Sequence, residues 1–250
     1  MIHILLPAYN ESDGIVELLK EIEAVTSDLD EPMRPVVVDD GSTDGTAEQV
    51  RTYDGSLPVV LLEHEQNRGL GGALETGINE IIRSGEPGDL VVTMDADLTH
   101  SPRYIPQLYA IMKEDIDVVV ASRYASGGQE IGVSGFRRLL SHGAAWFYRF
   151  ALGHIGVHDF SCGYRMIRWD VLKKTRDGWG DRLFEFPGFS CTGELLLKIL
   201  GYSHPSRFTE IPFSLHYERK RGESKMPTLR TIRGTLALLF AARRLRRPPE

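Results

Sequence analysis

Short runs of apolar residues alternate along the first half of the chain with longer stretches in which apolar residues recur every three or four positions. Such runs, bounded by polar residues, are typical of strands that are buried on both faces of a sheet. They are found at 2–6, 35–38, 58–62, 91–94 and 117–121. The alternation predicts an α/β fold with a mostly parallel, doubly wound sheet flanked by helices.

The stretches between these runs have the spacing of amphipathic helices. The first has a single apolar stripe, made of Ile15, Leu18, Leu19, Ile22 and Val25. Further helices are expected around 47–50, from the glycines at 69–72 to about Arg83, and over 104–114. Ser12 or Asp13 is placed to cap the first helix, and Thr43 or Asp44 the second.

Polar loops follow the strands at their carboxyl ends, which is the edge where doubly wound sheets bind ligands. These loops are Pro7–Glu11, Asp39–Asp44, Asn67–Gly72 and Asp95–Asp97. We expect them to converge on one crevice. The first loop lacks Gly-x-Gly-x-x-Gly, and no Gly-Lys-Ser/Thr motif is present. Dinucleotide redox enzymes and Walker-type nucleotide hydrolases are therefore disfavoured.

Two acids spaced one apart, Asp95 and Asp97, end the fourth apolar run. If the chain stays extended through Ala96, both carboxylates point to the same side. Paired carboxylates suit Mg²⁺ or Mn²⁺, especially when a diphosphate completes the coordination. The alternative is a solvated strand end with no ligand.

The glycines at 69, 71 and 72 would let backbone amides approach a phosphate or a sugar, and Arg68 adds a positive charge. The same glycines are also compatible with a turn that has no ligand. The eight histidines form no metal-ligand pair, and we interpret them as structural or surface residues. Cys162 and Cys191 form no metal-binding motif, and a reduced chain is expected.

Length and composition indicate a globular protein whose chain is long enough to bury a hydrophobic core. The chain has 250 residues, 42% of them hydrophobic and 26% charged, and a net charge of −6 that gives no case for nucleic acid. The apolar start, interrupted at Pro7, is too short for a signal peptide. No apolar run approaches the roughly 20 residues of a membrane-spanning helix.

The alternation fades past Tyr124. Residues 126–130 predict a mobile loop, and 136–152 predict a helix that bears Arg137, Arg138 and Arg149. For Arg137 and Arg149 a solvated face is the simpler interpretation. Asp159 and Arg165 are close enough in sequence to form an internal ion pair.

The tail from Glu218 onward is strongly basic, with ten basic residues against three acidic ones. Its apolar residues are Leu229, Ile232, Leu236, Leu239 and Phe240. This pattern predicts an amphipathic helix on an anionic membrane surface. The alternative is a helix that docks on the protein or forms a dimer. We divide the chain into a main domain at 1–217, with halves 1–125 and 126–217, and a tail at 218–250 that we expect to associate with a membrane.

Several motifs occur in a fixed order. They are Pro7-Ala8-Tyr9-Asn10-Glu11, Val38-Asp39-Asp40-Gly41-Ser42-Thr43-Asp44-Gly45-Thr46, Gly69-Leu70-Gly71, Asp95-Ala96-Asp97, Ser122-Arg123-Tyr124, Arg138-Leu139-Leu140-Ser141 and Arg221-Gly222-Glu223-Ser224-Lys225. Together they resemble the family 2 glycosyltransferases of GT-A fold. Within that family they look like the polyprenyl-phosphate hexosyltransferase branch, to which dolichyl-phosphate mannose synthases belong.

The resemblance implies a role for each motif. Pro7, Tyr9, Glu11, Asp39 and Asp40 would hold the base and ribose, with Arg68 and Gly69 nearby, and Asp95 and Asp97 would hold the metal and diphosphate. Arg123, Arg138, Ser141, Arg221, Ser224 and Lys225 would bind the acceptor phosphate. The segment from Asp159 to Arg165 would close beneath the sugar. Glu194 is either a sugar contact or an acid at the start of a helix.

One position departs from the pattern of that branch. Position 99 is usually Gln there and can join the metal shell, whereas this chain has Thr99. Water can replace such a ligand, since Mg²⁺ commonly keeps several waters.

The implied reaction is the inverting transfer of a hexose, mannose from GDP-mannose, to a polyprenyl or dolichyl phosphate with Mg²⁺ or Mn²⁺. The alternatives are UDP-glucose as donor, undecaprenyl phosphate or a soluble acceptor, a nucleotidyltransferase, and a non-catalytic lipid-phosphate binder. A soluble hydroxyl acceptor needs a general base, for which Asp159 and Glu194 are the candidates. A cytoplasmic protein peripheral to the membrane is expected, and a separate membrane subunit is a possible partner.

Overall fold

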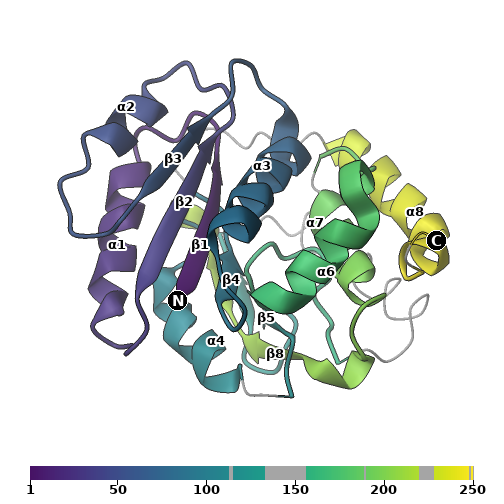
Figure 1. Cartoon of the computed structure of the whole chain (residues 1–250). Helices are drawn as coiled ribbons and strands as arrows, with labels where there is room; N and C mark the ends of the chain where they lie inside the picture. Colours follow the sequence, from purple (N-terminus) through teal and green to yellow (C-terminus); the bar gives the residue numbers. More distant parts are fainter. Residues whose placement is uncertain (113–114, 133–155, 189, 220–227, 248, 250) are drawn as a thin grey trace.

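A computed structural model describes residues 1–112, 115–132, 156–188, 190–219, 228–247 and 249. It has a seven-stranded sheet in the order β3-β2-β1-β4-β7-β5-β8 and a two-stranded sheet of β6 and β9. Figure 1 shows the large sheet running through the molecule with helices packed around it. The predicted α/β fold with a mostly parallel sheet is confirmed.

The first half follows the expected alternation. Its strands are β1 (Ile2–Ala8), β2 (Met33–Asp39), β3 (Val60–Glu63), β4 (Leu90–Thr93) and β5 (Val118–Ser122). Its helices are α1 (Ile15–Thr26), α2 (Thr46–Arg51), α3 (Gly69–Ser84) and α4 (Ile105–Ile111), the last preceded by a 3₁₀ turn, η1 (Pro102–Tyr104). All five residues of the predicted apolar stripe on α1 are buried, because that face packs into the core.

The predicted helix caps are only partly right. The N-cap of α1 is Gly14, and neither Ser12 nor Asp13 caps the helix. The amides of Gly14 and Ile15 donate instead to the carbonyl of Glu11, which satisfies them without a side chain. At α2 the N-cap is Gly45, in the left-handed region at φ 91°, while Asp44 accepts the amide of Thr46 at 3.0 Å.

The strand β7 (Arg165–Arg168) was not predicted and lies between β4 and β5, antiparallel to both. The strand β8 (Phe208–Pro212) pairs in parallel with the other side of β5. Part of the predicted loop at 126–130 is a strand as well, because β6 (Gln129–Ile131) pairs with β9 (Ser214–His216). The second half thus completes the sheet that the first half begins.

Three helices of the second half lie together at one side of the sheet in Figure 1: α6 (Trp169–Trp179), α7 (Ser190–Ile199) and α8 (Thr228–Leu245). Short 3₁₀ turns are η2 (Gly180–Arg182), η3 (Pro205–Arg207) and η4 (Tyr217–Arg219). Every residue of α7 is buried, since α3, α6 and α8 surround it. Among the described residues, no helix combines the length and the apolar character needed to cross a membrane.

Several predicted features lie outside the described residues. They are the helix at 136–152 with Arg137, Arg138, Ser141 and Arg149, and the motif containing Arg221, Ser224 and Lys225.

Candidate functional site

The loops that follow β1 and β2 are joined by hydrogen bonds. The amide of Asn10 donates to Ser42 Oγ at 2.9 Å, and the amide of Thr43 donates back to Asn10 Oδ1 at 2.9 Å. The amide of Glu11 donates to Thr46 Oγ1 at 2.9 Å. These bonds fix the first loop against the second at the carboxyl edge of the sheet.

Asp40 connects the second loop to the glycine-containing loop. Its Oδ1 accepts the amide of Arg68 at 2.8 Å and lies 2.6 Å from His64 Nδ1, and its Oδ2 accepts the amide of Gly69 at 2.8 Å. Asp40 is 3% exposed. Both carboxylate oxygens therefore hold the start of α3, where amides are otherwise without helical partners. The amide of Gly69, which we expected among those that approach a phosphate or sugar, donates to this carboxylate, as does the amide of Arg68.

Asp39 and Arg68 also have partners within the protein. Asp39 is buried, and its Oδ1 accepts both the amide of Ser42 at 3.1 Å and the Ser42 hydroxyl. The Arg68 guanidinium, on an exposed side chain, lies 3.3 Å from Thr76 Oγ1. Tyr9 and Glu11 are half-buried in the loop after β1.

A small pocket lies where the chain order of the sheet reverses. β1 pairs with β2 on one side and with β4 on the other, so β1 and β4 flank the switch point at which doubly wound sheets bind ligands. The pocket is lined by Pro7, Leu70, Leu74, Thr93, Met94, Asp95, Gly163, Arg165, Thr192 and Leu195. Residues from the first, third and fourth predicted loops thus meet here, whereas no residue of the second loop, Asp39–Asp44, lines the pocket. The expected convergence is therefore only partly observed.

The acid pair lies in a turn and not on a continued strand. β4 ends at Thr93 and the chain bends at residues 96–100, so the condition of an extended chain through Ala96 is not met. Leu98 has a left-handed φ of 66° within this bend. Asp97 Oδ1 accepts both the amide of Thr99 at 3.2 Å and its hydroxyl at 2.6 Å. Asp95 remains 40% exposed.

The donor set at this turn fits a hard divalent cation. Two carboxylates are partly exposed beside a pocket, and in the part of the chain that the structure describes no cluster of three His, Cys, Asp or Glu side chains could hold a metal. Mg²⁺ and Mn²⁺ accept such a sparse set because water or a diphosphate supplies the remaining oxygens. Thr99 directs its hydroxyl to Asp97.

His100 is a residue that the sequence interpretation missed. It is 3% exposed, and its Nδ1 accepts the amide of Asp95 at 2.9 Å. Its only signal in the sequence is its place just after the acid pair, which distinguishes it from the other seven histidines.

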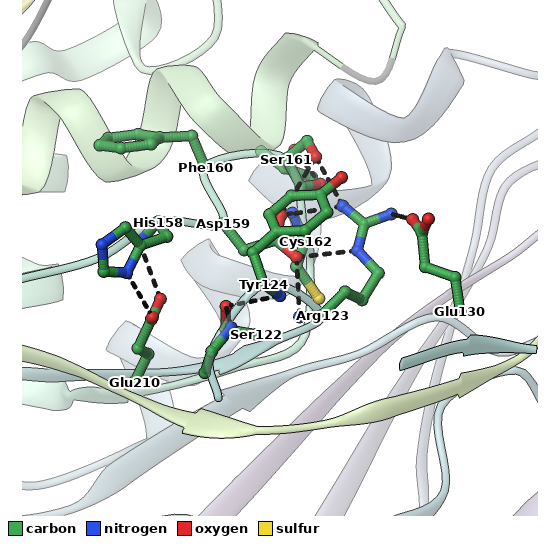
Figure 2. A network of polar contacts seen from close by, with 12 residues as sticks. Ser122, Arg123, Tyr124, Glu130, His158, Asp159, Phe160, Ser161, Cys162 and Glu210 are labelled. Carbon is green, nitrogen blue, oxygen red and sulfur yellow. Dashed lines mark hydrogen bonds and ion pairs between the residues drawn. The ribbon is translucent and has the colours of Figure 1, made fainter. Parts of the chain in front are cut away.

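A second charged cluster lies at the end of β5 (Figure 2). Arg123 Nε and Nη2 donate to the two carboxylate oxygens of Asp159, each at 2.8 Å, and Nη1 donates to Glu130 at 3.3 Å. Asp159 also accepts the amides of Arg123 at 3.1 Å and Cys162 at 3.0 Å. Arg123 Nη2 donates further to Ser161 Oγ at 2.7 Å.

The electrostatics of this cluster are those of a buried pair. Asp159 is fully buried and the Arg123 side chain is 14% exposed. Burial alone would raise the pKa of Asp159, but the charge and hydrogen bonds of Arg123 outweigh it and hold that pKa below its ordinary value. Burial alone would lower the pKa of Arg123, and Asp159 raises it well above its ordinary value.

The predicted ion pair between Asp159 and Arg165 is wrong. Asp159 pairs with Arg123, while the buried Arg165 donates to the carbonyls of Thr192 at 2.5 Å and Phe160 at 2.7 Å. The carbonyls fix Arg165 next to the pocket, which it helps to line.

Glu194 lies within α7 and not at its start. It is fully buried, accepts the amides of Glu185 at 2.8 Å and Phe186 at 3.0 Å, and pairs with Lys198 at 2.6 Å. Burial raises the pKa of Glu194, and Lys198 only partly opposes that shift. Glu194 thereby anchors the loop before α7, and both of its oxygens have protein partners.

The tail helix α8 docks on α7 and still exposes apolar side chains. Gly234, Leu238, Ala242 and Leu245 are buried, whereas Phe240 is 88% and Leu236 46% exposed. Arg244 pairs with Glu185 at 3.2 Å, in the loop that Glu194 anchors. The contacts agree with the alternative of a helix docked on the protein, and association with a membrane surface stays a prediction.

Comparison with known proteins gives one family: residues 3–176 match the family described as "Glycosyl transferase family 2". A dolichol-phosphate mannosyltransferase from Pyrococcus furiosus is 33% identical over 226 residues, which is 90% of this chain and 59% of the relative. An undecaprenyl-phosphate 4-deoxy-4-formamido-L-arabinose transferase from Edwardsiella ictaluri is 32% identical, over 92% of this chain and 64% of the relative. The chain thus spans about three-fifths of the length of these relatives.

An undecaprenyl-phosphate mannosyltransferase from Micrococcus luteus is 29% identical over 89% of this chain and 86% of its own length. Among solved structures, glucosyl-3-phosphoglycerate synthase from Mycobacterium tuberculosis, in complex with Mn²⁺, UDP-glucose and glycerol 3-phosphate, superposes with a TM-score of 0.65. That structure is 20% identical and covers 100% of this chain and 81% of the other. At this identity the likeness concerns the fold alone, and it agrees with the predicted GT-A architecture.

Proposed function

Since the chain belongs to glycosyl transferase family 2, we propose that it transfers a hexose from a sugar nucleotide to the phosphate of a polyprenol, with inversion at the sugar C1. The observation that supports this most strongly is the partly exposed acid pair of Asp95 and Asp97 beside a pocket at the switch point of the sheet. The names of the relatives agree, because all three describe transferases that use a polyprenyl phosphate.

For the donor we propose GDP-mannose. Two of the three relatives are named as mannosyltransferases, whereas the third is named for an arabinose derivative. UDP-glucose is the main alternative. The base and ribose would bind along the loops after β1 and β2, at Pro7, Tyr9, Glu11 and Asp39, while Asp40 holds the neighbouring loop in place.

The state of the candidate bases favours a phosphate acceptor. A hydroxyl acceptor must lose a proton during attack, whereas a polyprenyl phosphate is already anionic near neutral pH. The two general bases considered from the sequence are Asp159 and Glu194, and both are fully buried and hydrogen-bonded to protein groups. We therefore assign them to holding the acceptor half of the site and not to proton transfer.

Asp95 and Asp97 would hold Mg²⁺ or Mn²⁺. When bound, the cation would neutralise negative charge on the departing nucleoside diphosphate. The Mn²⁺ named in the solved glycosyltransferase structure is consistent with this choice of ion. Thr99 and His100 keep the two acids in their turn through the hydrogen bonds described above.

The acceptor phosphate would be bound by arginine and lysine side chains, which align it for attack on C1. Arg123 already shares its charge with Asp159 and Glu130, so Arg138 and either Arg221 or Lys225 would supply most of the neutralisation. Ser141 and Ser224 would add hydrogen bonds. Arg138→Ala should therefore raise the KM for the lipid more than it lowers kcat.

We place the protein peripherally on the cytoplasmic face of a membrane, through the exposed face of α8. Phe240 and Leu236 are exposed beside Arg243 and Arg247, a combination that suits an anionic lipid surface. Phe240→Glu should weaken flotation with vesicles that contain phosphatidylglycerol. The same change at Ile111, an exposed apolar residue of α4, should not. Equal flotation of the two variants would rule out this face, and a separate membrane subunit would then be the alternative.

The experiment that tests the function is a mass-spectrometric transfer assay with Mg²⁺ or Mn²⁺, a panel of GDP- and UDP-sugars, and polyprenyl phosphate. A hexosyl-phosphoryl lipid formed from GDP-mannose is the expected product. A product formed only with a soluble acceptor would contradict the lipid assignment and leave the family intact. Consumption of no donor, together with binding of none, would favour a non-catalytic protein, and release of pyrophosphate would indicate a nucleotidyltransferase.

A further inference from the structure

The turn that bears the acid pair is held by residues that are not themselves acids. We propose that His100 is the positioning residue of this turn, and that it fixes Asp95 by accepting the Asp95 amide at Nδ1. This inference rests on the proposed function, in which Asp95 and Asp97 hold a divalent cation.

His100 contacts Asp95 at two points. Nδ1 accepts the Asp95 amide at 2.9 Å, so this nitrogen bears no proton. Nε2 lies 3.7 Å from Asp95 Oδ2. The first contact is a hydrogen bond that fixes the Asp95 backbone, and the second, which is longer than a hydrogen bond, places the ring beside the Asp95 carboxylate.

The imidazole is itself fixed by two aromatic rings. It stacks on Tyr164 with ring centroids 5.2 Å apart and planes 19° apart, and it meets Phe213 edge-on at 5.4 Å. Tyr164 and Phe213 are buried, and the Tyr164 hydroxyl donates to the carbonyl of Ser101 at 2.9 Å. Both rings belong to the second half: Tyr164 lies directly before β7 and Phe213 directly after β8. The second half of the chain thus sets the orientation of an acid from the first half.

The backbone between the acids and His100 is bent to allow this contact. Leu98 adopts φ 66°, a conformation that leucine rarely takes, and its side chain is 1% exposed. Gly14 makes room for it, because a Cβ at that position would lie 3.1 Å from Leu98 Cδ1. A strained residue persists only where its surroundings enforce it, and such residues cluster at functional sites. The bend returns Thr99 to Asp97 and His100 to Asp95.

The contact between His100 and Asp95 matters because the proposed metal site has only two carboxylate ligands. Among the described residues, no group of three His, Cys, Asp or Glu side chains could hold a metal. Loss of orientation at Asp95 would therefore affect one of the two proposed carboxylate ligands. Groups that orient a ligand without touching the metal typically contribute about 10–100-fold to metal affinity.

Two substitutions separate the hydrogen bond from the ring. His100→Phe keeps a ring to stack on Tyr164 and removes the acceptor. His100→Asn places an amide oxygen where Nδ1 was and removes the ring. The matched control is His3→Gln, since His3 is equally buried and contacts Asp89 at 2.8 Å at the opposite edge of the sheet.

Mn²⁺ affinity is measured by electron paramagnetic resonance, with GDP and separately with UDP, and thermal unfolding is followed in parallel. We expect His100→Phe to bind Mn²⁺ about 10–100-fold more weakly than the wild type. His100→Asn should recover most of that affinity, and His3→Gln should keep all of it, although both unfold at lower temperature. In the ¹⁵N spectrum of the wild type, His100 should show an unprotonated Nδ1.

These results distinguish a positioning role of His100 at Asp95 from a role in stability alone. Wild-type affinity in folded His100→Phe would overturn the inference, and so would equal loss in His100→Phe and His100→Asn, since Asn restores only the Nδ1 acceptor. If His100→Phe does not fold, the ¹⁵N spectrum decides, and a proton on Nδ1 overturns the proposal. A wild type that binds no Mn²⁺ with either nucleotide would refute the proposed metal site, whereas equal binding by all variants would refute the role of His100 alone.

Discussion

Two aspartate-containing turns lie at the carboxyl edge of the same sheet and have opposite environments. Asp95 and Asp97 follow β4 and remain partly exposed, and Asp95 lines a pocket. Asp159 lies against the end of β5, is fully buried, and is paired with Arg123 (Figure 2). Buried charges are costly unless they are paired and hydrogen-bonded, so the second turn is built for structure. Only the first leaves carboxylate surface for a ligand.

The largest effect is expected at the exposed turn. Asp97→Ala should reduce metal-dependent transfer by about 1,000-fold or more, because a metal ligand contributes several kcal/mol to the transition state. The free energy of unfolding should fall by about 1.5 kcal/mol or more, because Asp97 accepts the amide and the hydroxyl of Thr99. The protein should nevertheless remain folded. The control is Asp30→Ala, an exposed acid before β2, which should retain full activity. If purified Asp97→Ala transferred sugar at the wild-type rate, the exposed turn would have no metal-binding role that separates it from the buried turn.

At the buried turn, Asp159→Asn should lower the free energy of unfolding by about 3–5 kcal/mol, because it leaves the Arg123 charge buried without its main partner. Urea unfolding at neutral pH measures this loss. A stable Asp159→Asn that has lost transfer would instead identify Asp159 as a general base.

The same pair predicts the response to acid. The pKa of Asp159 lies below its ordinary 3.8, so its stabilising contribution is complete above about that pH and is lost as the pH falls further. The pKa of Asp44 is likewise lowered, to about 2. Wild-type stability should therefore decline below pH 3.8, with a shallower decline in Asp159→Asn. If stability fell with pH equally in the wild type and in Asp159→Asn, Asp159 would not be the source of the acid sensitivity.

For Lys198→Met, which removes the partner of buried Glu194, we expect the free energy of unfolding to fall by a smaller amount, about 2 kcal/mol. The loss is limited because burial already raises the pKa of Glu194, so the carboxyl can become neutral. A raised native pKa means that stability is greatest below 4.5 and falls as the pH rises through the native pKa. The deficit of Lys198→Met should accordingly be larger at pH 8 than at pH 5, as measured by urea unfolding. If the loss of unfolding free energy in Lys198→Met were smaller at pH 8 than at pH 5, the proposed pairing of Glu194 with Lys198 would be contradicted.

The smallest effect is expected for Thr99→Val, which removes the hydroxyl that donates to Asp97. A hydrogen bond to a charged group contributes about 1.5 kcal/mol, and unfolding experiments should show a loss of that order. Thr99→Ser should restore most of it. A Thr99→Val as stable as the wild type would show that the turn does not depend on this bond.

The sequence was informative where the signal was local. Five apolar runs became β1 to β5, and the stripe from Ile15 to Val25 became the buried face of α1, because periodicity depends on neighbouring residues alone. Pairings between distant residues were missed. Asp159 was matched with Arg165, six residues away, whereas its partner Arg123 is 36 residues away.

The contacts of several single residues could not be predicted either, because their partners are distant in the sequence or carry no pattern. Asp40 was assigned to the ribose by its motif, yet its partners are the amides of Arg68 and Gly69, 28 and 29 residues later. β7 has only four residues and begins and ends with arginine, so no apolar pattern identified it. His100 resembled any other histidine until its contact with Asp95 was visible.

The insertion of β7 also determines when the sheet can be completed during synthesis. β1 to β4 pair with one another as they emerge from the ribosome, but both neighbours of β5, β7 and β8, are made later. Until residue 168 is available, β4 has an open edge and β5 has no partner, which is the situation that invites aggregation. A fragment that ends near residue 125 would keep this edge permanently. Residues 1–125 are therefore not expected to fold as an independent unit, and the pocket likewise takes its lining from both sides of this boundary.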